Sequence, residues 1–380
     1  MGENLEIRKI FNAWVPIKFV FGKPTEEPYD REKEINELVT LIRRKQSVIL
    51  IGSRRIGKTS ILLKVLSSLN TPKVYISAED FVEGKSFDIY SFFLSLSSQL
   101  LIEAIKIMEP RRRIVSSMRE KGERLINSIR DLIGYIKISL NINLISLEIF
   151  LERRDKFKHN IRELADLPQQ LAEKVGQDFV IVIDEFQYLK LAEQNLPGLF
   201  HVLRSKWQFH KDVEYVVSGS SIGVLERMIS KDSEPFFQFF FPIYVKPFTK
   251  EVSKSFLRAG FESEGKPFDE VALDIVIQEI DGYPAWLNYF SLKALNCDVV
   301  NTLCTEKVLK EMVSNPLLLN LIKADYDKLG KNAKRVIKFL AEKGGVGSLR
   351  GIGLNRSSVN EGLKSLLGEG YIGKGREGDL

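Results

Sequence analysis

The chain has 380 residues, of which 44% are hydrophobic and 28% are charged. This composition is typical of a globular protein with a large core, and it excludes disordered, collagen-like and disulfide-scaffold chains. The formal net charge of +6 is uneven: residues 321–380 hold twelve Lys or Arg against seven Asp or Glu, and residues 110–130 hold seven against two. The two local basic patches are therefore more informative about function than the mildly basic charge of the whole chain.

The sequence shows no signs of a membrane or secreted protein. It contains no run of eighteen apolar residues, and its first residues, MGENLEIRKIF, lack the apolar stretch of a secretory signal. We therefore expect no membrane span and a cytoplasmic location. Two cysteines, Cys297 and Cys304, and three histidines are too few for a structural metal site. We expect both cysteines to be small buried apolar residues.

Five short apolar runs rich in β-branched residues are predicted to be strands, and helical patterning separates each from the next. Continuous apolar runs are typical of strands buried on both faces of a parallel sheet, and their alternation with helices indicates an α/β fold. The gap between the second and third runs, about a hundred residues, is too long for a simple crossover and predicts an insertion. The runs cover residues 47–52, 73–77, 179–185, 213–220 and 242–248, and the insertion covers about residues 84–177.

The insertion is predicted to be mostly helical, with helices over residues 91–108 and 157–175. Between these helices, apolar and polar residues alternate from Tyr135 to Leu144. Strict alternation is the pattern of a half-buried strand, so we expect a short β segment on a helical arm.

The C-terminal third is predicted to be helical. After Phe248 the helical patterning is interrupted at DGYPAWL, where Gly282 and Pro284 break it. A helix over KNAKRVIKFLAEKG, a second helix from Ser358 with Glu361 in capping-box spacing, and a hairpin-like tail, YIGKGREG, then follow in winged-helix order. The sequence therefore predicts an α/β domain over residues 1–247, a small helical domain over 248–318 and a winged-helix-like domain over 319–380.

A phosphate-binding loop is predicted directly after the first strand. The segment GSRRIGKT matches the pattern G-x-x-x-x-G-K-[ST] and leads into the helical pattern TSILLKVLSSL. Main-chain N–H groups of such a loop, and the positive end of the following helix, bind phosphate. Lys58 can reach the terminal phosphates, the Thr59 hydroxyl can ligate Mg²⁺, and Arg54 and Arg55 either contact phosphate or lie exposed. The predicted site comprises Gly52, Ser53, Arg54, Arg55, Ile56, Gly57, Lys58, Thr59 and Ser60.

The third strand, VIVIDE, predicts the acidic half of the same site. Asp184 follows four apolar residues and so emerges at the carboxyl end of its strand, where it can hold Mg²⁺ through water. Glu185 is placed to orient or deprotonate an attacking water, which favours hydrolysis over the transfer of phosphate to a hydroxyl by a kinase. A polar group that senses the γ-phosphate is expected in VVSGSS, at Ser218, Ser220 or Ser221, and we favour Ser220.

Five segments together resemble one protein family. GSRRIGKTS, VIVIDEFQYL, VVSGSS and DGYPAWL, with PYDREKEINEL ahead of them, resemble the archaeal ATPase family of P-loop proteins, which is related to the AAA+ and STAND NTPases. The resemblance implies an ASCE-type sheet, a helical lid and a C-terminal winged helix. It implies that Lys58 and Thr59 contact phosphate and Mg²⁺, and that Asp184 binds Mg²⁺. It also implies that Glu185 is the catalytic base and that Gly282 to Pro284 lie in the lid near the nucleotide.

The resemblance fails at one position. Family members often carry an arginine in a segment after the sensor strand, but here the corresponding stretch reads SEPFFQFFFPIYVKPF. An arginine supplied by the same chain is therefore in doubt, with Arg204 and Arg227 as substitutes that the sequence does not rank.

These observations favour an ATP-binding, Mg²⁺-dependent ATPase that acts as a nucleotide-driven switch and repositions a winged-helix module. The alternative is a DNA-binding regulator that binds ATP as a ligand with little hydrolysis. Residues 319–380 could bind DNA or a protein partner, since winged helices do both, and the sequence predicts no oligomeric state. The basic residues that could face DNA are Lys331, Lys334, Arg335, Lys338, Arg350, Arg356, Lys364, Lys374 and Arg376.

Overall fold

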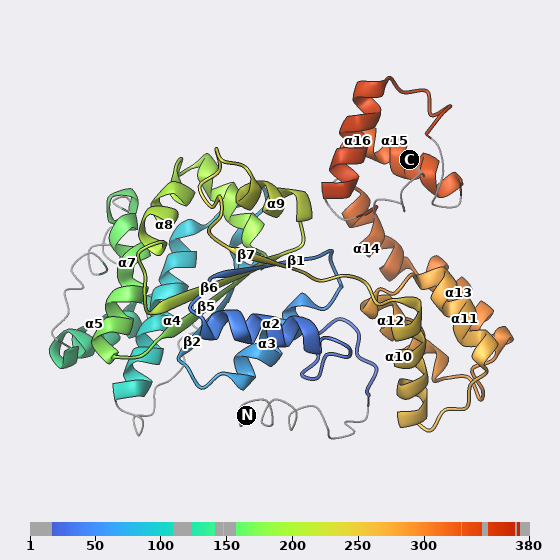
Figure 1. Cartoon of the computed structure of the whole chain (residues 1–380), viewed down its shortest axis with the longest axis horizontal. Coiled ribbons are helices and arrows are strands. Elements are labelled where there is room, and N and C mark those ends of the chain that lie inside the picture. The colour runs from blue at the N-terminus through green and yellow to red at the C-terminus, as the bar shows by residue number, and fades with distance from the viewer. Residues whose placement is uncertain are drawn as a thin grey trace. The chain divides into compact units, whose positions relative to one another are not determined.

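The computed structural model describes residues 17–108, 123–140, 147, 157–327, 329–343, 349–368 and 371–372 (Figure 1). The chain divides into two compact units, which we describe separately. The sheet unit comprises Lys33–Arg54, Ile61–Val245 and Gly330–Leu380, and the helical unit comprises Met1–Glu32, Arg55–Ser60 and Lys246–Leu329.

A five-stranded parallel sheet forms the centre of the sheet unit, and it confirms the five predicted strands. Its order is β2-β5-β6-β1-β7, so β1 lies between β6 and β7. Every residue of β1, β5 and β6 is buried, as the continuous apolar runs require. The strands are β1 (Val48–Ile51), β2 (Lys73–Ser77), β5 (Phe179–Asp184), β6 (Val213–Gly219) and β7 (Phe241–Tyr244).

Helices cover both faces of this sheet, so the strands β1, β5 and β6 are buried along their whole length. Figure 1 shows α2 and α3 on one face and α4, α7 and α8 on the other. The aromatic side chains of Phe186, Phe200 and Phe236 meet in the core, with ring centroids 5.5–5.7 Å apart. The helices of the sheet unit that lie outside the insertion and before residue 231 are α2 (Glu32–Arg43), α3 (Lys58–Ser68), η4 (Phe186–Gln194), α8 (Leu199–Trp207) and α9 (Ile222–Ser230).

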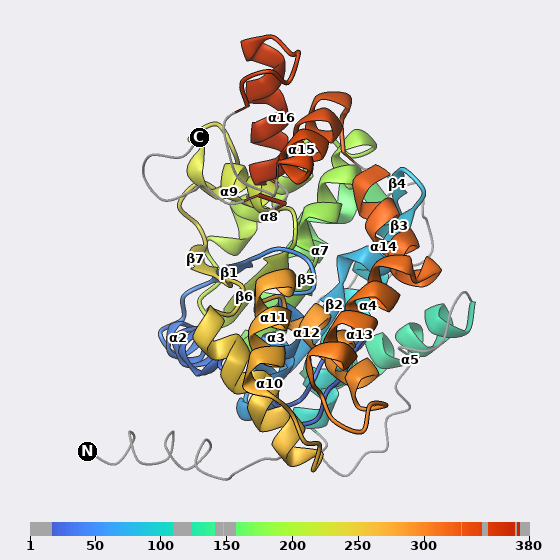
Figure 2. The same ribbon diagram turned by 90° about the vertical axis from the view of Figure 1, so that its right-hand side faces the viewer.

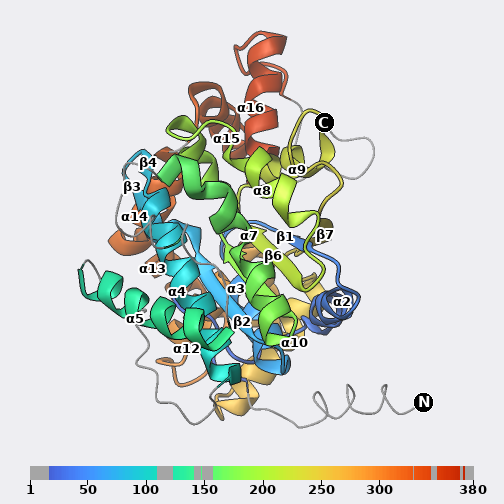
Figure 3. The same ribbon diagram turned by 90° about the vertical axis from the view of Figure 1, so that its left-hand side faces the viewer.

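The predicted insertion lies between β2 and β5 (Figure 3). Both predicted helices are confirmed, and α4 is the one helix in the described residues that is long and apolar enough to cross a membrane. Because 67% of its most apolar window is buried inside the protein, α4 has the character of a core helix. The inserted elements are η1 (Ala78–Phe81), β3 (Val82–Glu83), β4 (Ser86–Phe87), α4 (Ile89–Met108), α5 (Glu123–Leu140) and α7 (Phe157–Val175).

The strand predicted from Tyr135 is wrong as far as Leu140, because α5 continues to that residue. Ile129, Ile133 and Ile136 are fully buried at helical spacing, and α5 packs against α4. Helical burial has therefore overridden the alternating pattern in this segment. Residues 141–144 of the predicted strand lie outside the described residues.

The helical unit is built from five consecutive helices and the N-terminal segment (Figure 2). Phe19 packs into its core against Phe256 and Phe261, and the ring lies directly over Gly260. A Cβ at Gly260 would come within 2.2 Å of that ring, so glycine permits this contact. The helices are α10 (Lys250–Ser263), α11 (Glu270–Ile280), α12 (Pro284–Ala294), α13 (Thr302–Ser314) and α14 (Pro316–Asp327).

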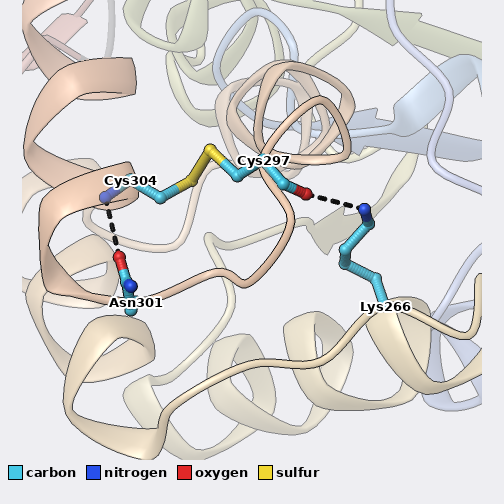
Figure 4. The surroundings of a disulfide bond; sticks show 4 residues. All are labelled: Lys266, Cys297, Asn301 and Cys304. Carbon is cyan, nitrogen blue, oxygen red and sulfur yellow. Dashed lines mark hydrogen bonds between the residues drawn. A yellow bond between two sulfur atoms is a disulfide. The ribbon is translucent and has the colours of Figure 1, made fainter.

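Cys297 and Cys304 form a disulfide bond that joins the end of α12 to the start of α13 (Figure 4). The expectation of two separate buried thiols is therefore wrong. The Cα atoms of the two residues are 6.2 Å apart. Lys266 donates a hydrogen bond to the carbonyl oxygen of Cys297 at 2.7 Å, and Asn301 caps α13 by accepting the N–H of Cys304 at 3.0 Å.

Two helices end the described chain, α15 (Lys331–Glu342) and α16 (Arg356–Gly368). They pack closely at Gly362, where a Cβ would lie 2.9 Å from the carbonyl oxygen of Asn332. The predicted capping box is wrong, because α16 starts before Ser358 and the side chain of Asn355 accepts the N–H of Ser358 at 2.8 Å. Glu361 instead accepts a hydrogen bond from Asn332 on α15. Most of the predicted hairpin-like tail, from residue 373 on, lies outside the described residues.

Glu214, the second residue of β6, is a carboxyl group inside the sheet unit with 3% of its surface exposed. Burial first, and then the nearby charge of Asp178, raises its pKa from 4.5 to about 7. The unfolded chain therefore releases this proton near pH 4.5 and the folded chain near pH 7. As a result, the folded protein loses stability as the pH rises between these two values.

We expect Glu214→Gln to raise the free energy of unfolding by roughly 2 kcal/mol at pH 8 and to change it little at pH 4. The amide has no proton to release, so the pH-dependent loss disappears. Urea titrations of both proteins at the two pH values measure the effect, with Glu163→Gln on the exposed side of α7 as the control. An equal pH dependence in wild type and Glu214→Gln would contradict this account.

Candidate functional site

The predicted phosphate loop connects β1 to α3, and Lys58 and Thr59 are the first two residues of that helix. Arg55 and Gly57 have positive φ angles of 64° and 99°, so the loop reverses sharply just before the helix begins. Lys58 is buried, with 5% of its surface exposed. This is the strand–loop–helix arrangement that presents main-chain N–H groups to an anion.

Asp184 is the last residue of β5, and its carboxylate accepts hydrogen bonds from side chains of neighbouring strands and from the main chain. Tyr75 on the neighbouring strand β2 donates its hydroxyl to Oδ2 at 2.9 Å. The Ser218 hydroxyl and the N–H of Glu185 both donate to Oδ1, the latter at 2.9 Å. Asp184 itself is 4% exposed. Burial, and then the adjacent carboxylate, raises the pKa of Tyr75, so its hydroxyl stays protonated and remains a donor.

Glu185 has a left-handed backbone with φ 52° and ψ 43°. Non-glycine residues rarely adopt this strained conformation, which recurs at active sites. Ser220, which follows β6, donates its hydroxyl to Oε2 of Glu185 at 2.8 Å and its N–H at 3.3 Å. Gln187 donates its side-chain N–H to the same oxygen. The structure therefore brings Ser220 into direct contact with Glu185, while Ser218 contacts Asp184.

The two arginines of the loop have protein partners in different units. Arg54 donates to the hydroxyl of Tyr188 at 2.8 Å, and that hydroxyl donates to Glu79 at 3.3 Å, all within the sheet unit. Within the helical unit, Arg55 forms an ion pair with Asp325 of α14 at 2.9 Å, and its guanidinium lies 5.0 Å from the ring centroid of Trp286. The sequence left open whether these two arginines contact phosphate or lie exposed. Both residues are partly buried, so the exposed alternative does not describe them.

The predicted lid motif lies at the turn between α11 and α12. Pro284 is the first residue of α12, where its fixed φ suits a helix start. The carbonyl of Gly282 accepts the N–H of Phe248 at 2.9 Å. Within the helical unit, buried Arg31 donates hydrogen bonds to the carbonyl oxygens of Ile56, in the phosphate loop, at 3.2 Å and of Lys246 at 3.0 Å.

The two substitute arginines differ in environment. Arg204 lies 4.7 Å from the ring centroid of Phe239 and donates to Gln208 at 2.8 Å. Arg227 is exposed on α9. The guanidinium of Arg204 therefore contacts side chains of its own unit, the sheet unit.

The parallel sheet places residues that follow three of its strands at one edge. Because all five strands run in the same direction, Gly52 after β1, Asp184 at the end of β5 and Ser220 after β6 follow the same edge of the sheet. Ligands of open α/β sheets bind at this edge. The donor set also fits Mg²⁺, since a carboxylate and a hydroxyl are hard oxygen ligands and the ion keeps several waters and substrate phosphates.

Several residues of the site were not predicted from the sequence. Tyr75 has no local signal, because its contact with Asp184 depends on the register of β2 against β5. Gln187 and Tyr188 lie in the motif DEFQY itself, so their position two and three residues after Glu185 could have drawn attention to them. Asp325 is 270 residues from its partner Arg55, and no sequence pattern connects the two.

The comparisons with known proteins agree with this geometry. A family model described as an ATPase domain predominantly from Archaea matches residues 29–290. The chain is similar to the Walker-type ATPase PABY2304 of Pyrococcus abyssi, with 19% identity, a TM-score of 0.60, and coverage of 94% of this chain and 95% of that one. It is also similar to the ORC2 protein of Aeropyrum pernix in ADPNP–ADP complexes, with 12% identity, a TM-score of 0.51, and coverage of 93% and 89%. A search of curated protein sequences returned no match.

The structural likenesses show the fold, which is that of an α/β P-loop NTPase with a parallel sheet. The family match covers well over half of the chain and includes both the phosphate loop and the Asp184–Glu185 pair. The resemblance stated from the sequence motifs is thereby confirmed. The chain belongs to the archaeal ATPase family and is an ATP hydrolase of the P-loop class.

Proposed function

We propose that this ATPase is a nucleotide-driven switch, in which Mg²⁺-dependent hydrolysis of ATP changes the position of the C-terminal helices α15 and α16. The loop amides from Gly52 to Gly57 hold the phosphates, and Lys58 neutralises their charge. Thr59 and Asp184 hold Mg²⁺, which when bound stabilises negative charge on the phosphate oxygens. Glu185 accepts a proton from the attacking water.

The contact between Arg55 and Asp325 carries this proposal. Arg55 lies inside the phosphate loop, and Asp325 lies near the end of α14, the helix that precedes α15 in the chain. Their side chains are 25% and 10% exposed, so water screens the ion pair only partly. A change of the loop on loss of the γ-phosphate therefore acts on α14 directly, without an intervening residue.

A second contact supports the same direction of coupling. Ser220 precedes α9 by two residues, and α9 contacts α16 within the sheet unit. A sensor that moves with the γ-phosphate would therefore shift a helix on which α16 rests. We propose that Ser220 and Pro284 lie close to the bound nucleotide, and that residues 319–380 form the module that the switch repositions.

Hydrogen exchange with the ATP analogue ADPNP and with ADP tests the switch. We expect amides of α14 to differ in protection between the two nucleotides in wild type, because the Arg55–Asp325 pair is made in one state and weakened in the other. Asp325→Asn removes the charge but keeps the shape, so the difference should be lost while nucleotide affinity remains. Asp298→Asn, at an exposed position of the helical unit, is the matched control. Equal protection of α14 with both nucleotides in wild type would refute the switch.

One observation favours DNA binding as a second function. Six of the nine basic residues named from the sequence are exposed, Lys334 is half-buried, and Lys374 and Arg376 lie outside the described residues. Exposed cations on two adjacent helices can neutralise phosphates in a salt-dependent way. Fluorescence anisotropy with duplex DNA at two salt concentrations separates the functions, because a DNA-binding regulator binds at low salt. The exposed residues are Lys331, Arg335, Lys338, Arg350, Arg356 and Lys364.

A further inference from the structure

The carboxylate of Glu185 is held through a single oxygen. The N–H and hydroxyl of Ser220 and the side-chain N–H of Gln187 all donate to Oε2. Gln187 also donates to the Ser220 hydroxyl at 3.3 Å, so the three residues form a closed triangle of hydrogen bonds. In the described part of the chain, the other carboxylate oxygen, Oε1, lies outside this triangle. Oε1 is therefore the oxygen that can accept a proton from water.

The orientation of the Gln187 side chain follows from its partners. A carboxylate can only accept hydrogen bonds, so the amide nitrogen of Gln187 must face Glu185. The amide oxygen, Oε1, then points the other way, where it is buried and has no hydrogen-bond partner among the described residues. Gln187 is 8% exposed, and buried amide oxygens of this kind are nearly always satisfied in proteins.

Gly219 makes room for that unsatisfied oxygen. A Cβ at residue 219 would lie 2.0 Å from the amide oxygen of Gln187, so only glycine allows the side chain to reach Glu185 in this position. Glycine at position 219 therefore leaves the room that the amide of Gln187 occupies when it contacts Glu185. A leucine or methionine at 187 would fill the space without an unsatisfied polar group.

We propose that Gln187 is a positioning residue for ATP hydrolysis, which fixes the carboxylate of Glu185 so that Oε1 faces the attacking water. The inference rests on the proposed role of Glu185 as the base. Gln187 contacts neither the nucleotide nor water in this assignment, and it acts only through Glu185. A displacement of about 1 Å at a reacting group costs up to about a hundredfold in rate, which sets the size of the expected effect.

Steady-state hydrolysis by the full chain tests the proposal. Gln187→Leu should lower kcat by roughly ten- to a hundredfold while the Kd for ADPNP, measured by calorimetry, stays within about twofold of wild type. Its thermal midpoint should equal or exceed that of wild type, a result that a purely structural role of Gln187 would not give. Gln187→Glu keeps the shape but places two carboxylates together, and should lose at least as much kcat. Gln194→Leu, exposed in the same helix η4, is the control.

Gly219→Ala tests whether the position of Gln187 matters. The new Cβ displaces the amide, so this variant should reproduce the loss of kcat seen in Gln187→Leu. In a Gln187→Ala background the clash with the amide is removed and the contact with the Leu225 side chain, 2.8 Å from the new Cβ, remains. Gly219→Ala should therefore lower kcat less in that background than it does in wild type. Additive losses in the two variants would overturn the positioning role.

Failure of the inference is distinguishable from failure of the proposed function. If wild type releases phosphate, Glu185→Gln does not, and Gln187→Leu keeps or exceeds the wild-type kcat, only the role of Gln187 is refuted. If wild type itself releases no phosphate above background, the role of Glu185 fails, and the role of Gln187 fails with it.

Discussion

Glu185→Gln is expected to lower kcat for ATP hydrolysis by about 10²- to 10⁴-fold while leaving the Kd for ATP nearly unchanged. The amide keeps the size of the side chain and can still contact Ser220, but it cannot accept a proton from water. Because the phosphate loop is untouched, nucleotide should bind as before and remain unhydrolysed. Phosphate release in single-turnover conditions measures the chemical step, and calorimetry measures binding.

Lys58→Ala should differ from Glu185→Gln in its affinity for ATP. Loss of the buried ammonium group removes the positive charge that we propose neutralises the terminal phosphates, so we expect affinity for ATP as well as kcat to fall. Lys64→Ala lies two turns later in α3 and controls for the loss of a lysine from the same helix. Equal phosphate release by wild type, Lys58→Ala and Glu185→Gln would contradict the assignment of both residues.

The parts of the fold that were predicted from the sequence are those that local physics determines. Strands buried on both faces are mostly apolar, so residues 48–51, 179–184 and 213–219 stand out in the sequence. The phosphate loop requires glycine where the backbone turns and a helix directly after it, which ties its motif to one geometry. Helices α4 and α7 are long and strongly periodic, and their bounds were predicted closely.

Features that depend on distant partners were not predictable in this way. From Ile129 to Ile138 the sequence carries both a helical and an alternating pattern, and only packing against α4 decides between them. The disulfide needs the Cα atoms of Cys297 and Cys304 6.2 Å apart, which sequence spacing does not show. Any of many carboxylates could have paired with Arg55, and the choice of Asp325 depends on how α14 folds back within its unit.

Gly282, the glycine of the predicted lid motif, should be difficult to replace by any other residue. Gly282 has a φ of +74°, and a Cβ there would lie 2.1 Å from the main-chain oxygen of Phe248. A main-chain atom cannot rotate away as a flexible side chain can. The two segments must therefore separate, and the hydrogen bond from the N–H of Phe248 to the carbonyl of Gly282, now 2.9 Å long, is lost with them.

We expect Gly282→Ala to lower the free energy of unfolding of the helical unit by about 3 kcal/mol or more, since strain and a main-chain clash add to each other. Gly265→Ala is the matched control, because Gly265 also has a positive φ, +61°, but a Cβ there would meet nothing within 4 Å. That variant should cost only about 1 kcal/mol, the penalty of the left-handed backbone alone. Hydrogen exchange of α11 and α12 measures both effects. Equal losses in the two variants would show that φ, and not the contact with Phe248, requires glycine at this turn.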